Sequence, residues 1–289
     1  MRDNLLKFDS ADRGSWLMNA ASIYKNYNRF GKGEKVVFSF GNTVSPQKMQ
    51  PFHFVILACL IQFLNDHGWK ACLSQDNEEV FQFLFKELRF RDYWSGGKNH
   101  VETPYNTEIF NLWRIMKNEM ESFAYNVHNY FKEIYTDRDL SPIVLCLTES
   151  FYNIFDHAEA KDNAFVFLKH QKDKDNSILH AAIADFGKGI CQSVRDYSKE
   201  QCDDVEALKK AIKYHFTVKS TNRNKGYGLS TIIDNSDTAR IFSGNALFLK
   251  TDKVRRFYTA DFPFHGTLIY FEVDLSKADE EEIIDNFSF

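Results

Sequence analysis

The order of the apolar segments changes part-way along the chain, and this change limits the folds that the chain can adopt. Residues 35–90 show a strand, a helix, a second strand and a second helix, which is typical of a small α/β unit. From residue 107 onward, long helical patterns come first and several strands follow them. The sequence therefore predicts an α+β chain of two domains, residues 1–105 and 106–289.

In the first half, KVVFSFG (residues 35–41) is rich in residues that favour strands. Phe52–Asp66 is expected to form an apolar helix that begins after Pro51 and ends at the dipeptide HG. WKACLSQ predicts the second strand, and NEEVFQFLFKEL predicts a helix capped by Asn77. The Gly, Pro and polar residues of YWSGGKNHVETPYN (residues 93–106) predict a linker.

In the second half, residues 107–135 are expected to form one long helix. Its apolar stripe, which needs a partner surface, consists of Phe110, Trp113, Met116, Met120 and Phe123. DRDLSP interrupts the pattern, and another helix follows through TESFYNIFDHA (residues 148–158). The segments NAFVFLK, SILHAAIADF, ALFLK and GTLIYFEVDL then predict strands of a mixed, mostly antiparallel sheet.

Composition restricts the class of protein. A chain with 44% hydrophobic and 26% charged residues is typical of soluble globular proteins, and its 28 Phe predict a core of aromatic rings. The net charge of -4 does not favour nucleic acid as a partner. The longest apolar run, Phe54–Leu64, is too short to cross a bilayer, and the start lacks the apolar core of a signal peptide. Five scattered Cys without metal spacing favour reduced thiols and a cytoplasmic location.

The helix through TESFYNIFDHA carries polar residues at steps of four: Glu149, Asn153 and His157. Four residues are just over one helical turn, so these side chains should stack along one stripe. The alternative interpretation is a solvated face of an amphipathic helix.

A strand that ends in IADFGKGI delivers Asp185 into a turn with Gly187 and Gly189. Glycine lets the backbone approach a ligand closely. A carboxylate at the end of a buried strand requires a hydrogen-bond donor, and the exocyclic amino group of a purine is a suitable one. The alternative is a polar strand end followed by an ordinary turn.

The stretch STNRNKGYGLSTII contains a second glycine turn, Lys225–Leu229, that leads into a helical pattern. A turn of this kind presents backbone N–H groups and the positive end of the helix dipole to phosphate. It is not a P-loop, because GxxxxGK[ST] is absent. An ordinary helix start is the alternative.

Taken in order, these elements resemble the GHKL superfamily of ATP-binding domains, which includes gyrase, Hsp-type chaperones, histidine kinases and mismatch-repair ATPases. The helix of Glu149 looks like the N-box of that family, Asp185–Ile190 looks like its first glycine box, and Lys225–Leu229 looks like its second. The resemblance covers about residues 106–275 and implies a Bergerat α/β sandwich, with ATP and Mg²⁺ as cofactors.

The resemblance also implies roles for single residues. The residue matching Asn153 coordinates magnesium through its side-chain oxygen, and the residue matching Glu149 acts as a base toward the attacking hydroxyl or water. The residue matching Asp185 binds adenine N6, helped by a threonine that Thr267 resembles. His157 stands where anti-sigma-factor serine kinases often carry His, although a structural histidine that anchors the helix is equally consistent with the pattern.

The glycines are expected to shape the nucleotide site. By the resemblance, Gly187 and Gly189 let the backbone pass under the base, with Ile190 closing the first box. Gly226 and Gly228 let the lid and the helix start wrap the phosphates, and Lys225, Tyr227 and Leu229 complete the second box. The segment Cys191–Lys225 between the boxes is expected to be a mobile lid.

Two functions are consistent with these residues. One is a magnesium-dependent ATPase or protein serine/threonine kinase of a bacterial partner-switch system. The other is a nucleotide-dependent protein-interaction module without significant turnover. A histidine kinase is disfavoured because His128 lacks the usual following acidic residue and proline. An ATP-driven clamp is disfavoured because it needs a further domain, and only the acidic SKADEEEIIDNFSF follows the last strand.

The first half resembles, more weakly, the STAS-like domains found beside GHKL modules. Ser39 and Ser45 lie near the turn where a STAS phosphosite would fall, but ordinary turn serines are the favoured interpretation. The expected partners are ATP or ADP and a protein, with a homodimer through the helix 107–135 as one arrangement. Neither nucleic acid nor a membrane is expected as a partner.

Overall fold

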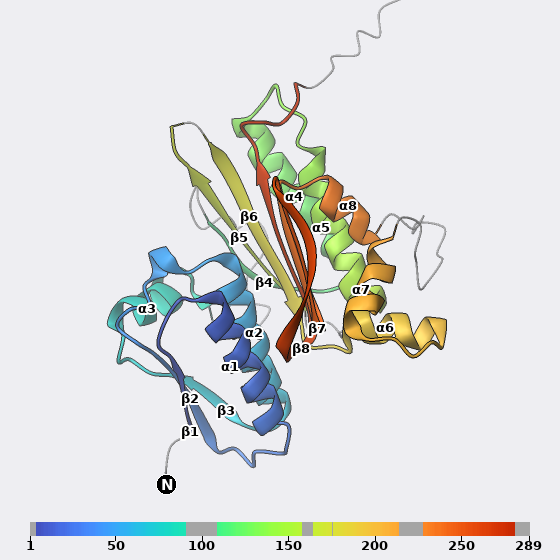
Figure 1. Ribbon diagram of the computed structural model, residues 1–289. Coiled ribbons are helices and arrows are strands. Elements are labelled where there is room, and N and C mark those ends of the chain that lie inside the picture. Colours follow the sequence, from blue (N-terminus) through green and yellow to red (C-terminus); the bar gives the residue numbers. More distant parts are fainter. Residues whose placement is uncertain (1–3, 91–108, 158–163, 175, 214–227, 281–289) are drawn as a thin grey trace, which may run out of the picture.

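The computed structural model describes residues 4–90, 109–157, 164–174, 176–213 and 228–280 (Figure 1). We call residues 4–90 the amino-terminal lobe and residues 109–280 the carboxy-terminal lobe. The predicted linker, residues 93–106, lies outside the described residues. The chain combines a parallel and an antiparallel sheet with helices, so the mixed α/β character expected from the sequence is confirmed.

A small parallel sheet forms the base of the amino-terminal lobe, in the strand order β1-β2-β3. The elements of this lobe are β1 (Asn4–Phe8), α1 (Arg13–Asn26), β2 (Lys35–Phe40), η1 (Pro46–Lys48), α2 (Pro51–Asp66), β3 (Lys70–Leu73), α3 (Glu78–Gln82) and the π-helical turn η2 (Phe83–Glu87). Both predicted strands and the apolar helix are confirmed. Asn77 caps α3 as expected, because its side chain accepts a hydrogen bond from the Val80 amide at 3.1 Å. The sequence patterns did not indicate β1 and α1.

A five-stranded sheet in the order β4-β5-β6-β8-β7 forms the centre of the carboxy-terminal lobe. The elements are β4 (Ile109–Ile115), α4 (Met120–Ile134), α5 (Ser141–Tyr152), the π-helical turn η5 (Asn153–His157), β5 (Ala164–Lys172), β6 (Ser177–Asp185), α6 (Gly189–Ser198), α7 (Asp204–Ile212), α8 (Gly228–Asp234), β7 (Thr238–Thr251) and β8 (Val254–Asp274). All described pairings in this sheet are antiparallel. Helices α4 to α8 cover one face, and the amino-terminal lobe lies against the other (Figure 1).

The predicted single helix over residues 107–135 is wrong. Its described part is a strand, β4, followed by a turn and α4. A β-bulge explains the error: Phe110 pairs with Leu168 and Trp113 with Val166, so β4 has one residue more than β5 in this stretch. The bulge leaves Phe110 and Trp113 in the same core cluster despite their helix-like spacing of three.

The apolar face of α4 is used inside the chain. Met120, Phe123, Val127 and Phe131 are buried in the core between α4, α5 and the sheet, whereas Met116 is 44% exposed. The stripe that suggested a homodimer therefore finds its partner surface within the same chain.

The two lobes share an apolar cluster. Helix α2 lies on β5 and β6, and Phe54 of α2 stacks on Phe167 of β5 with ring centroids 4.3 Å apart. The cluster continues to Phe242 and Leu268 on the far strands. The apolar sequence of α2 follows from this position, because the helix is buried between the small sheet and the large one.

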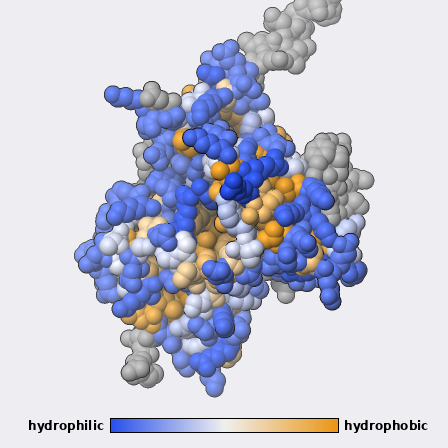
Figure 2. Space-filling model, viewed as in Figure 1, coloured by the Kyte–Doolittle hydropathy of each residue, from blue (hydrophilic) through white to orange (hydrophobic). Residues whose placement is uncertain are grey.

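The surface seen from the side of Figure 1 is mostly hydrophilic, and apolar residues show near its centre, where β8 passes the amino-terminal helices (Figure 2). Among the described residues, no helix is both long enough and apolar enough to cross a membrane.

Candidate functional site

The end of β6 points a carboxylate toward the helical face of the large sheet. Side chains alternate along a strand, and Ile183 of β6 lies in the core cluster beneath α5 and α8. Asp185, two residues later, projects to the same face. It pairs in register with Thr267 of β8. The two residues that the sequence assigned to the adenine are therefore direct neighbours.

Asp185 is fully buried, and backbone donors hold it in place. Its Oδ1 accepts a hydrogen bond from the Gly187 amide at 2.5 Å, and its Oδ2 accepts one from the Thr267 amide at 3.2 Å. The Thr267 hydroxyl lies close enough to favour the ionised carboxylate but makes no hydrogen bond of ordinary geometry to a described residue. Burial nevertheless raises the pKa of Asp185 to about 7. Each carboxylate oxygen can accept a further hydrogen bond, so the group can still receive a ligand donor.

Glycine is required where the turn after Asp185 meets Gly266 in the interior of β8. Gly189 (φ +77°) and Gly266 (φ +91°) both adopt the left-handed backbone conformation. A Cβ on Gly189 would lie 2.6 Å from the Gly266 carbonyl oxygen, and a Cβ on Gly266 would lie 2.1 Å from the Asp185 carbonyl oxygen. Of the two glycines of the first box, Gly189 thus has the positive φ that favours glycine.

Glu149 and Asn153 lie one turn apart where α5 passes into the π-helical turn η5. The Asn153 side chain donates a hydrogen bond to the Glu149 carbonyl oxygen at 2.6 Å, which fixes the amide against the helix. The amide nitrogen makes this bond, so the side-chain oxygen is the atom that the amide can offer to a cation. The side chain of His157 lies outside the described residues.

The Glu149 carboxylate is in an unusual environment for a helix residue. Its Oε2 is buried and has no hydrogen-bond partner among the described residues. Burial raises its pKa to about 7. An unpaired buried carboxylate oxygen is costly, and such atoms are frequent where a ligand or water completes the site. The solvated-face interpretation of this helix is therefore not supported at Glu149.

The remaining site residues lie around the same end of the sheet. η5 contacts α6, which begins at Gly189, and α5 contacts α8, which begins at Gly228. Ile190 and Leu229 are core residues, 3% and 1% exposed. Lys225, Gly226 and Tyr227 lie outside the described residues.

The expected lid is wrong for its first part. Residues up to Ile212 form two helices, α6 and α7, and Cys191 and Leu208 are buried in the core. The remainder, residues 214–225, lies outside the described residues.

Ser243 of β7 is a site residue that the sequence analysis did not identify. Its hydroxyl donates to the Gly266 carbonyl oxygen at 3.0 Å and accepts a hydrogen bond from the Cys191 amide at 3.4 Å. It thereby connects the start of α6 to Gly266 in the interior of β8. Nothing in the stretch IFSGNALF distinguishes this serine from an ordinary strand residue.

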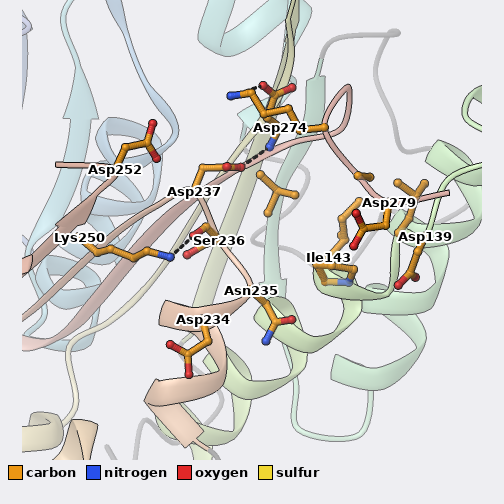
Figure 3. A pocket seen from close by; sticks show the side chains of 15 residues that line it. Asp139, Ile143, Asp234, Asn235, Ser236, Asp237, Lys250, Asp252, Asp274 and Asp279 are labelled. Carbon is orange, nitrogen blue, oxygen red and sulfur yellow. Dashed lines mark hydrogen bonds and ion pairs between the residues drawn. The ribbon is translucent and has the colours of Figure 1, made fainter. Parts of the chain in front are cut away.

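A hollow of about 350 Å³ lies at the opposite end of β6 and β8 (Figure 3). It contains none of the predicted site residues, and its acidic side chains are Asp139, Asp234, Asp237, Asp252, Asp274 and Asp279. Lys250 does not serve as a counter-ion to them, because its ammonium donates to the carbonyl oxygens of Ile233 and Ser236 at the end of α8. In the described part of the chain, no group of three or more His, Cys, Asp or Glu could hold a metal ion.

Neither the protein-family models nor the curated protein sequences that were compared with the chain give a match.

Proposed function

We propose that the chain is a magnesium-dependent ATP-binding regulatory protein, with a GHKL-type domain in residues 106–289 and a STAS-like domain in residues 1–105. The observation that carries this proposal is the position of Asp185. It is buried, is held by two backbone amides, and projects to the face of the large sheet that α5 also covers. A fold would gain little from burying a carboxylate in this way without a ligand for it.

Adenine fits the hydrogen-bonding requirement of Asp185. The two backbone amides use one acceptor position on each oxygen. An amino group of the ligand can use another, and it would favour the ionised form that burial disfavours. A purine with an oxygen at position 6 lacks this donor. The site therefore favours adenine over hypoxanthine.

Magnesium fits Asn153 and the bound phosphates together. Magnesium prefers oxygen ligands and is commonly held by one or two protein groups plus substrate phosphates. We assign the metal contact to the Asn153 amide oxygen, and the phosphates to the start of α8 and the preceding second glycine box.

Glu149 supports chemistry rather than binding alone. Its unpaired Oε2 and its pKa of about 7 suit a general base that accepts a proton from a hydroxyl or water near neutral pH. The nucleophile would be the hydroxyl of a partner protein in a kinase, or water in an ATPase. A nucleotide-dependent interaction module would not need this arrangement.

The deciding experiment is calorimetry with ATP and with inosine triphosphate, which carries an oxygen in place of the adenine amino group. The wild type should prefer ATP, and Asp185→Asn should lose about tenfold or more in ATP affinity, because hydrogen bonds to charged groups are worth about 1.5–3 kcal/mol. Asp274→Asn is the matched control. Asp274 is also a buried carboxylate at a strand end that accepts from backbone amides, but at the far end of the sheet. Equal ATP affinity in both variants would refute the site.

A further inference from the structure

The turn after Asp185 is held from the opposite face by the amino-terminal lobe. Phe186 follows Asp185 and packs among aromatic rings, with ring centroids 6.0 Å from Tyr24 of α1, 6.1 Å from Phe63 of α2 and 5.6 Å from Phe264 of β8. Asp185 is thus aimed at the helical face by a neighbour that is fixed to the amino-terminal lobe.

His265 connects the same lobe to the other strand of the site. Its ring stacks on Tyr24 with centroids 3.6 Å apart and planes 20° apart. The Phe186 backbone lies close enough to the His265 imidazole to raise its pKa, although burial lowers that pKa overall. His265 directly precedes Gly266 and Thr267, whose backbones contact Asp185. One ring of α1 therefore supports both strands that carry the adenine-binding residues.

We propose that Tyr24 is a positioning residue for the nucleotide site, so that the amino-terminal lobe sets the affinity and base selectivity of the carboxy-terminal one. This inference rests on the proposed function and specifies its regulation. Tyr24 packs on Phe186, which follows Asp185, and on His265, which precedes Gly266 and Thr267. It thereby sets the distance between Asp185 and its two amide donors. A partner or modification that shifts α1 would therefore change nucleotide affinity. Nucleotide binding would in turn stabilise the packing of α1 against the carboxy-terminal lobe.

The test uses the full chain with Tyr24→Leu, which removes the stacked ring but keeps an apolar side chain. Tyr27→Leu is the matched control, since Tyr27 caps the end of the same helix but packs on Trp69, 5.1 Å between centroids, away from the site. Tyr24→Leu should weaken ATP binding about tenfold, within the usual range of coupling between sites. It should also lower the ratio of ATP to inosine triphosphate affinity toward one. Tyr27→Leu should leave the ATP affinity and the ratio unchanged. Tyr24→Phe, which keeps the aromatic ring, should also keep the wild-type values of both.

The selectivity ratio separates positioning from general destabilisation, because loss of folded protein weakens both nucleotides equally. If Tyr24→Leu does not fold, His265→Leu takes its place in the test, because it removes the other ring of the same stack. If Tyr24→Leu or His265→Leu folds and keeps the wild-type ratio, the inference is wrong while the proposed function stands.

A second measurement keeps the inference testable if the wild type binds neither nucleotide, an outcome that would overturn the proposed function. This measurement is the hydrogen-exchange rate, without nucleotide, of the Gly187 amide, which donates a hydrogen bond to Asp185. Tyr24→Leu should raise its exchange rate about tenfold relative to Tyr27→Leu, the same factor as the expected loss of affinity. Equal exchange in the two variants would overturn the positioning role.

Discussion

Gly266 lies so close to Asp185 that a Cβ on Gly266 would stand 2.1 Å from the Asp185 carbonyl oxygen. The contact joins the end of β6 to the interior of β8 at the point where the carboxylate leaves the sheet. Close approach of two backbones is one of the few situations that require glycine rather than merely tolerate it.

Gly266→Ala should therefore destabilise the protein strongly. Gly33→Ala is the control, because Gly33 has a similar φ of +79° but no atom within 4 Å of the position that a Cβ would take. The control should lose only about 1–2 kcal/mol for the left-handed conformation. Gly266→Ala should lose at least about 2 kcal/mol more, since the clash is with backbone. Urea denaturation of both variants measures the difference, and equal losses would show that β6 and β8 can separate without cost.

The sequence predicted the local elements of the candidate site better than its surroundings. Asp185 ends a buried strand, and Glu149 and Asn153 lie one turn apart on one helical segment, as the apolar patterns indicated. These features depend on periodicity within a few residues of each group. The roles of these residues in binding ATP and magnesium stay predictions.

The errors occurred where tertiary contacts override local pattern. The bulge in β4 gives Phe110 and Trp113 a helix-like spacing, and only their partners on β5 reveal a strand. α6 and α7 are polar in sequence, which suggested a lid, but Cys191 and Leu208 anchor them in the core. The Tyr24–His265 stack joins residues from opposite ends of the chain, and no local pattern can predict such a contact.

The preference for ATP over inosine triphosphate should increase with pH. The pKa of Asp185 is about 7, and its ionised form accepts from the adenine amino group, whereas its protonated form can donate to the oxygen of hypoxanthine. If only the ionised form binds adenine productively, ATP affinity relative to that of inosine triphosphate falls about tenfold or more from pH 8 to pH 6. Calorimetry at both pH values measures the ratio, in which the titration of the phosphates cancels. Asp185→Asn should show a ratio independent of pH.

Asn153→Ala should abolish the strengthening of ATP binding by magnesium while leaving magnesium-free binding nearly unchanged. The reason is that the amide oxygen is proposed to contact the metal and not the nucleotide. Asn235→Ala is the matched control: its side chain makes the same bond to the carbonyl four residues earlier, at 2.8 Å, but at the end of α8 beside the far hollow. Titration with ATP in magnesium and in chelator gives the two affinities. A persistent magnesium effect in Asn153→Ala would contradict the metal role.

Glu149→Gln should gain stability relative to the wild type as pH rises from 5 to 8. The folded pKa of Glu149 is about 7, above its ordinary value of 4.5. The group therefore favours the folded state fully below pH 4.5, and this contribution is lost as pH rises through 7. Glutamine does not titrate, and Asp185 titrates equally in both proteins, so the difference reports on Glu149. A difference in unfolding free energy that is constant over this range would contradict the raised pKa of Glu149.

Glu149→Gln should also retain ATP affinity but lose turnover, since the carboxylate is expected to contact the nucleophile and not the nucleotide. Loss of a general base costs roughly 10²–10⁴-fold in rate, which a radiometric assay for released phosphate and labelled protein can detect. With a base of pKa about 7, the wild-type rate should rise between pH 6 and 8, and this rise should vanish in Glu149→Gln. Because the variant keeps the shape of the side chain, a parallel loss of ATP binding would place Glu149 on the nucleotide instead.

The alternative function, an interaction module, has a separate test. A wild type that binds ATP, yet neither hydrolyses nor transfers phosphate even with candidate partner proteins present, would favour the interaction module. The unpaired Oε2 of Glu149 would then need a different ligand, for which a hydroxyl of the partner protein is the first candidate.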